Sequence, residues 1–354
     1  VVSFSIFAFS PIWVKAKHRQ ITILNFGDMK NVLPPFKVDI AGTFLVPQSL
    51  MAAREQYRNG LITHIALREV EDTEISNLVD KLKTFGLKVV TDGNFRHESW
   101  ITDFMCNLDG IRMNPSKKKL ELINKIDTLR RHPVIDDFMF LTGITGGGVI
   151  AKQVLPAPSL IYTRLQKDSP EAIKQIYPDI NGLFTDIERI YNRLITKLYN
   201  SGCRYIQFDD TTRMVTTEAI AINNKVLTQL PDDLFVAFHA PADMLMSTTR
   251  VNAYFLDYDD ECCSRYKLLW YIKEQKSTFC FIPSYYPIEE ELDELRTKMD
   301  EVRRYIPLNR FTLCIPNAHK LSSEKYEVAQ KKQWHTFDMA RRVAEELWPQ
   351  EVYQ

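Results

Sequence analysis

Eight short apolar runs, each closed by turn-forming residues, alternate with longer segments of helical periodicity. Such runs predict buried strands, and their alternation with helices predicts a parallel sheet. Eight of these units favour an α/β fold of the (β/α)8 TIM barrel class, whereas a doubly wound sheet accommodates eight units less naturally. The runs are FKVDIAG (36–42), LKVVTDG (87–93), VIAKQVLPAPS (149–159), RYIQFDD (204–210), LFVAFHA (234–240), AYFLDYD (253–259), STFCFIPS (277–284) and FTLCIPN (311–317).

The segments between the runs carry apolar residues on one helical face. In 180–202 this face includes Leu183, Ile187 and Ile190, and Gly202 is the expected end of the helix. The stretch 95–145 lacks clear alternation, and we expect it to form an insert over the barrel mouth. GITGGGVI precedes a strand and does not open a helix, and no GxGxxG or GxxxxGK[ST] occurs, so a phosphate-binding loop is disfavoured.

Charge and cysteine content restrict the class of protein. The 354 residues carry 45 Lys and Arg against 45 Asp and Glu, which disfavours a nucleic-acid partner. The six cysteines contain no CxxC pair, and in a chain of this length they indicate reduced thiols and a cytoplasmic location.

The first residues differ from the rest of the chain. VVSFSIFAFSPIWV is apolar but too short to span a bilayer, and the basic KAKHR follows it, whereas a signal peptide carries its charge first. We therefore expect residues 1–33 to lie outside the fold, as from a mis-set start, and 34–354 to form one domain without membrane contact. A signal or anchor is the alternative.

Polar side chains cluster where the predicted strands end. Asp209 closes the fourth run, His239 the fifth and Asp257 the sixth, while His319 follows the eighth. In a barrel, these ends meet at one face, where active sites are built. Each residue also has an ordinary structural explanation: a single histidine is often a hydrogen-bonded structural residue, and Asp209 could cap the next helix. The convergence of several such groups favours a functional site.

Four stretches together resemble the short, single-domain relatives of cobalamin-independent methionine synthase. They are VVTDGNFRHESWITDF, GCRYIQFDDT, PDDLFVAFHA and AYFLDYDDE, and the resemblance extends from about Pro35 to Trp348. It implies a (β/α)8 barrel that moves a methyl group from a methyltetrahydrofolate to a thiol such as homocysteine. It also implies a zinc ion, which lowers the thiol pKa and presents a thiolate nucleophile.

The resemblance places a degenerate zinc site on His239, Asp257 and His319. The family's HxC cysteine falls on Pro241, its glutamate on Asp257, and its last cysteine on His319, or on Ala318 with a shift of one residue. These changes leave two interpretations open: a two-histidine, one-carboxylate site for zinc or ferrous iron, or loss of the metal, which we favour slightly.

The resemblance also names substrate-binding residues. Asp209 matches the aspartate that holds the substrate's amino group, Asn94 replaces a glutamate of the family, Thr43 keeps a hydroxyl after the first strand, and Trp100 is retained. We therefore expect a methyltransferase with Asp209 in the catalytic site. The alternatives are a metal-free protein that binds a small amino acid or thiol, and another metal-assisted lyase or hydrolase on the same barrel.

Overall fold

The structure is a computed structural model that describes residues 34–348, with gaps at 128–130, 211–214, 249–250, 259–264, 276, 284–291 and 322–323. The side chains of 258, 265, 266, 319 and 320 also lie outside the description. The prediction that residues 1–33 are an extension falls on a segment that is not described.

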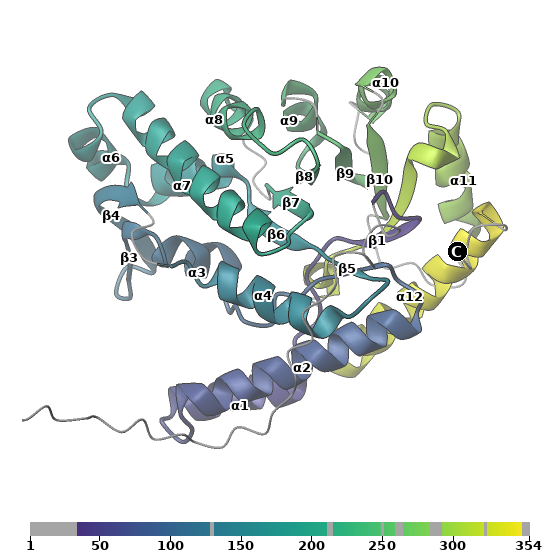
Figure 1. Ribbon diagram of the computed structural model, residues 1–354, viewed down its shortest axis with the longest axis horizontal. Helices are drawn as coiled ribbons and strands as arrows, with labels where there is room; N and C mark the ends of the chain where they lie inside the picture. The colour runs from purple at the N-terminus through teal and green to yellow at the C-terminus, as the bar shows by residue number, and fades with distance from the viewer. Residues whose placement is uncertain are drawn as a thin grey trace, which may run out of the picture.

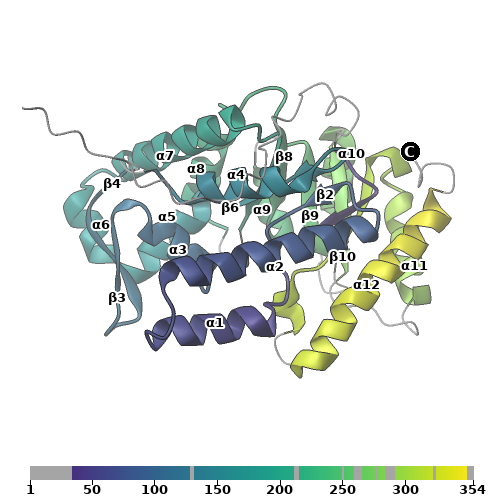
Figure 2. The ribbon, with the colours of Figure 1, turned by 60° about the horizontal axis from the view of Figure 1, so that its bottom comes forward.

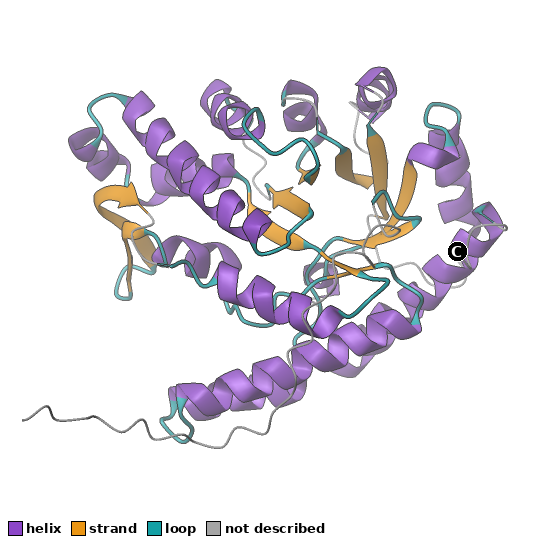
Figure 3. Ribbon diagram, viewed as in Figure 1, coloured by secondary structure: helices purple, strands orange, loops and turns teal. Residues whose placement is uncertain are grey.

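A curled parallel sheet of seven strands forms the centre of the molecule, in the order β1-β11-β10-β9-β8-β7-β6. Helices cover its outer face, as Figure 1 and the colouring of Figure 3 show. A second parallel pair joins β2 to β5. The strands are β1 (Val38–Ile40), β2 (Val89–Val90), β5 (Ile150–Ala151), β6 (Gln153–Pro156), β7 (Tyr205–Asp209), β8 (Phe235–His239), β9 (Ala253–Tyr258), β10 (Thr278–Pro283) and β11 (Phe311–Ile315).

Each of the eight predicted runs contains a strand, but the expected closed barrel is corrected to a TIM-like half-barrel. Among the described residues no strand ladder joins β1 to β2. The backbone turns out of the extended conformation at Gly42 (φ 124°) and Gly93 (φ 68°), shortly after β1 ends at Ile40 and β2 ends at Val90. Two hydrogen bonds bridge the gap: Phe44 N–H donates to Gly93 O (3.1 Å), and Thr91 Oγ1 donates to Gly42 O (3.0 Å).

The helices follow the predicted apolar faces. In α7 (Ile180–Asn200), the side chains of Leu183, Ile187 and Ile190 are fully buried. Gly202 follows the helix with a φ of 95°. No helix of the described part combines the length and apolarity needed to cross a bilayer. The helices are α1 (Gln48–Arg58), α2 (His64–Thr84), α3 (Trp100–Cys106), α4 (Val134–Thr145), α5 (Pro158–Asp168), α6 (Pro170–Ile176), α7 (Ile180–Asn200), α8 (Thr217–Leu227), α9 (Ala242–Ser247), α10 (Arg265–Gln275), α11 (Leu292–Arg303) and α12 (Tyr326–Leu347), with short 3-10 turns η3 (Leu308–Arg310) and η4 (Ala318–Leu321).

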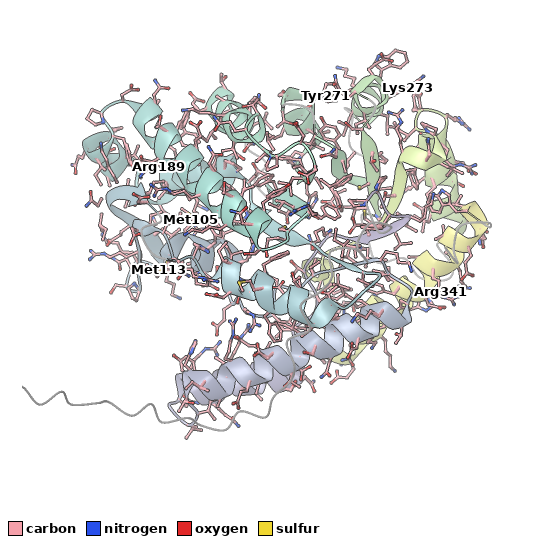
Figure 4. All side chains as sticks on the ribbon, viewed as in Figure 1. Met105, Met113, Arg189, Tyr271, Lys273 and Arg341 are labelled. Carbon is pink, nitrogen blue, oxygen red and sulfur yellow. The ribbon has the colours of Figure 1, made fainter. Side chains whose placement is uncertain are left out.

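The stretch 95–145 forms α3, an antiparallel hairpin and α4. The hairpin consists of β3 (Asp109–Asn114) and β4 (Lys119–Asp127). Asp127 at its end pairs with Arg189 of α7 (2.7 Å), which Figure 4 labels beside the hairpin. Figure 2 shows α1 and α2 packed side by side, with α12 next to α2. The insert is thus an ordered part of the fold, attached to its helical layer.

A polar cluster lies inside the curled sheet. The fully buried Lys152 sits between β5 and β6, and its Nζ is 2.8 Å from Asp39 Oδ1 of β1. Lys152 also donates to the backbone oxygen of Ile40 and to Gln207 Oε1 of β7 (2.8 Å). Tyr205 donates its hydroxyl to Asp39 Oδ2 (2.6 Å). Because every partner is buried, the cluster fixes the positions of β1, β6 and β7 relative to one another.

Candidate active site

A cavity opens where β1, β2, β6 and β7 end, at the carboxyl edge of the sheet. The cavity itself is narrow, with a volume of about 30 Å³, and it widens into open solvent at its mouth. Parallel strands bring these ends together, which explains why residues far apart in the chain meet here. The lining residues are Gly42, Thr43, Asp92, Asn94, His97, Trp100, Phe104, His132, Val134, Gln153, Val154 and Asp209.

Four residues predicted to bind substrate line this one cavity: Thr43, Asn94, Trp100 and Asp209. Backbone contacts hold two of them. Thr43 N–H donates to Asn317 Oδ1 (2.8 Å). Asn94 has a φ of 64° and its N–H donates to Asp92 Oδ1 (2.9 Å), in a left-handed turn that asparagine tolerates well. The structure places these four side chains together, while their roles stay predictions.

Asp209, His239 and Asp257 form a chain of side chains beside the cavity. Asp209 lies opposite His239 in the register of β7 and β8, and its Oδ1 contacts His239 Nδ1. His239 Nε2 is 3.4 Å from Asp257 Oδ2 of β9. Asp209 lines the cavity and is nearly buried, whereas the side chain of Asp257 is 44% exposed. The convergence expected from the sequence is therefore present for these three residues.

The two carboxylates determine the charge of His239. Burial lowers the pKa of His239, but Asp209 and Asp257 outweigh it and raise the pKa to about 10. At neutral pH the imidazole is therefore a cation, held between one carboxylate at the cavity wall and one at the surface. The contact with the imidazolium orients the Asp209 carboxylate. Within the described part of the chain, neither contacting atom of this pair has another hydrogen-bond partner.

The neighbouring Asp210 has a structural place. Its carboxylate is buried and accepts a hydrogen bond from Ser159 Oγ at the start of α5. Its N–H donates to His239 O (2.8 Å). The described helix α8 begins only at Thr217 and is capped by Thr216, whose Oγ1 accepts from Ala219 N–H (3.2 Å). Thr216, and not Asp209, therefore caps this described helix, while the expected helix start near residue 211 lies outside the described residues.

The insert brings two imidazoles to the cavity that the sequence analysis did not select. His132 is buried: Val134 N–H donates to its Nδ1 (3.3 Å), and its Nε2 lies 3.1 Å from Phe104 O. Burial lowers the pKa of His132 to about 4, so the ring is neutral. His97 precedes Trp100 within FRHESW, and this position in a quoted motif was the available signal.

The predicted zinc ligands are described only in part. Nε2 of His239 and Oδ2 of Asp257 lie close enough to share a cation, and the Asp209 contact to Nδ1 is the support that metal-binding histidines receive. The side chain of His319 lies outside the description. Among the described residues no three His, Cys, Asp or Glu groups gather around a metal-sized site. The described donors therefore do not complete the three protein ligands of catalytic zinc.

Comparison with known proteins gives relatives that span the whole fold. No protein-family profile matches the chain. The chain is 27% identical to the uncharacterized protein YxjG of Bacillus subtilis, covering 93% of this chain and 99% of YxjG. It is 26% identical to the uncharacterized protein YxjH of the same organism, covering 89% and 95% of the two chains.

Two solved structures are similar to this one. A protein from Listeria monocytogenes, provisionally described as a vitamin-B12-independent methionine synthase, matches with a TM-score of 0.73 and 27% identity over 90% of this chain and 99% of the other. A B12-independent methionine synthase from Shewanella, solved with selenomethionine, matches with a TM-score of 0.65 and 13% identity over 88% and 98%, which supports the fold alone. The likeness to the Listeria structure supports a methionine-synthase-like protein.

Proposed function

We propose that this protein is a methionine-synthase-like methyltransferase that acts on a small sulfur-containing amino acid. The likeness to the Listeria structure over 90% of the chain carries the proposal. Two observations support it: the cavity gathers Thr43, Asn94, Trp100 and Asp209, and the Shewanella relative holds selenomethionine, an amino acid of this class. The fold of the proposed enzyme is the TIM-like half-barrel described above, in which β2 and β5 form a separate pair.

The reaction moves a methyl group from a methyltetrahydrofolate-type donor to a thiol such as homocysteine. The carbon–nitrogen bond of the donor breaks, a carbon–sulfur bond forms, and the thiol proton ends on the donor nitrogen. Asp209 accepts hydrogen bonds from the substrate ammonium group, and the His239 cation keeps the Asp209 carboxylate in place. Trp100 and Phe104 give the cavity apolar walls that suit a thioether or thiol side chain. A zinc ion on His239, Asp257 and His319 would displace the proton from His239 Nε2, and it would then supply Lewis-acid activation of the thiol.

Binding of L-methionine, measured by calorimetry, tests the proposal directly. We expect wild-type protein to bind it, and Asp209→Asn to lower the affinity roughly 10- to 100-fold, because a neutral amide replaces the charged partner of the ammonium group. Asp243→Asn, on the exposed side of α9, is the matched control and should bind as wild type. A thermal-unfolding curve verifies that each variant is folded.

Turnover and metal content complete the test. The same preparations are assayed for homocysteine methylation with methyltetrahydrofolate, and their zinc content is measured in wild type and His239→Ala. Binding of L-methionine without turnover and without zinc would indicate an amino-acid-binding protein. No affinity for L-methionine or homocysteine would refute the proposal.

A further inference from the structure

A groove separate from the cavity lies between α2 and α12, which Figure 2 shows next to each other. Its volume is about 170 Å³, which is enough for a small organic molecule and not only for a single water. The loops that follow β1 and β2 complete its walls. The lining residues that carry the argument are Leu45, Glu74, Leu78, Lys81, Phe95 and Gln333.

Gln333 brings a buried amide group to this groove. The residue is only 3% exposed, and its Oε1 accepts the N–H of Leu45 (2.8 Å) in the loop after β1. This bond fixes which end of the amide faces Leu45, so Nε2 is the end left to donate. Nε2 has no hydrogen-bond partner among the described residues. A buried donor without a partner is unfavourable, and a ligand atom that accepts from Nε2 would remove this penalty.

Lys81 adds a positive charge to the same groove. Its Nζ lies 3.6 Å from the centroid of the Trp334 ring, and Phe85 stacks on Trp334 with 6.0 Å between the ring centroids. Partial burial lowers the pKa of Lys81, and no carboxylate of the described residues lies close enough to raise it. The ammonium group therefore has an aromatic partner but, within the described part of the chain, no ion-pair partner.

The other end of the groove limits the charge of a ligand. Glu74 precedes Lys81 by about two turns of α2, which is about 10 Å along the helix axis. Its Oε1 accepts a hydrogen bond from Ser49 Oγ of α1. A carboxylate at this end repels a second negative charge. Between the two ends, the buried side chains of Leu78 and Phe95 form an apolar wall.

The groove and the cavity are neighbours but share no described lining residue. In the loop after β1, Thr43 lines the cavity and Leu45 lines the groove. In the loop after β2, Asn94 lines the cavity and Phe95 lines the groove. The two loops therefore separate the two sites.

We propose that the groove between α2 and α12 is a second ligand site, which binds a small monocarboxylate with an apolar body. Lys81 Nζ and Gln333 Nε2 bind the carboxylate by charge-assisted hydrogen bonds. Leu45, Leu78 and Phe95 contact the apolar body. The inference does not depend on the proposed function, because it uses none of the residues that line the cavity.

Hexanoate and its neutral amide, hexanamide, test the inference in ligand-observed NMR titrations of the full chain. We expect wild type to bind hexanoate roughly tenfold more tightly than hexanamide. Lys81→Gln removes the charge, so it should weaken hexanoate binding roughly tenfold and change hexanamide binding by less than about twofold. Gln333→Glu keeps the acceptor for Leu45 N–H but replaces the Nε2 donor, so it should remove the preference for hexanoate. Lys331→Gln, exposed on α12, is the matched control and should bind as wild type.

Each other outcome overturns the inference in a distinct way. No binding of hexanoate to wild type, or equal affinity for the two ligands, would refute a carboxylate site. An equal loss in Lys331→Gln and Lys81→Gln would show unspecific attraction to surface charge. Displacement of hexanoate by L-methionine would place it in the cavity. Binding of inorganic phosphate through Lys81 without binding of hexanoate would refute the apolar part of the site. Thermal unfolding verifies each fold, and Lys81→Gln alone decides if Gln333→Glu does not fold.

Discussion

His132 is a buried imidazole that binds a proton less readily in the folded protein than in the unfolded chain. Its pKa in the folded protein is about 4, because burial penalises the charged ring, whereas an unfolded chain has a value of about 6.5. The unfolded state therefore binds more protons between these values, and stability falls as the pH drops below 6.5. Above pH 6.5 this group has no effect on stability.

The size of this effect can be measured in urea-unfolding experiments. Between pH 7 and pH 4.5 wild type should lose about 2.5 kcal/mol more of its unfolding free energy than His132→Gln, whose side chain does not titrate. His64→Gln, at an exposed position, should lose as much as wild type. A pH dependence identical in wild type and His132→Gln would show that His132 does not titrate as described.

Asp39 and Lys152 link two elements, β1 and the β5–β6 run, through a buried ion pair. Removing either partner leaves the other charge buried, so Asp39→Asn and Lys152→Met should each cost roughly 3 to 5 kcal/mol of unfolding free energy. The double variant should cost less than the sum, with a coupling of about 2 kcal/mol.

An exposed ion pair provides the comparison for this double-mutant cycle on Asp39 and Lys152. Arg112 and Glu121 pair across the hairpin at 2.9 Å with the arginine 64% exposed, and their coupling should be below about 1 kcal/mol. Equal coupling in the two cycles would show that burial adds nothing to the Asp39–Lys152 pair.

The strands could be predicted because their signals are local. Apolar runs closed by turn residues identified all eight strand positions, and the ends of those runs identified Asp209, His239 and Asp257. The hairpin β3–β4 was missed because its residues alternate weakly and it packs on α7, far along the chain. The Asp39–Lys152 pair was also invisible, since a lysine within an apolar run does not indicate which distant strand holds its partner.

Two of the attachments between the insert and the rest of the fold involve parts of the insert that are far apart in the chain. One is the cavity wall, where Arg54 of α1 donates to Phe95 O (2.6 Å). The other is the helical flank, where Ile126 N–H donates to Tyr177 OH (2.7 Å) and Asp127 pairs with Arg189. The two attachments share no residue, so we expect the hairpin end and the cavity wall to open independently.

Tyr177→Phe separates these two attachments. The variant leaves the buried Ile126 N–H without its acceptor, which should cost roughly 1 to 3 kcal/mol locally. Amide hydrogen exchange should therefore accelerate in the hairpin, while exchange in α3 and the affinity for L-methionine stay within about twofold of wild type, because the cavity wall keeps its own contacts. Faster exchange in both segments, together with weaker binding, would show that the insert opens as one cooperative unit and that the flank controls the cavity.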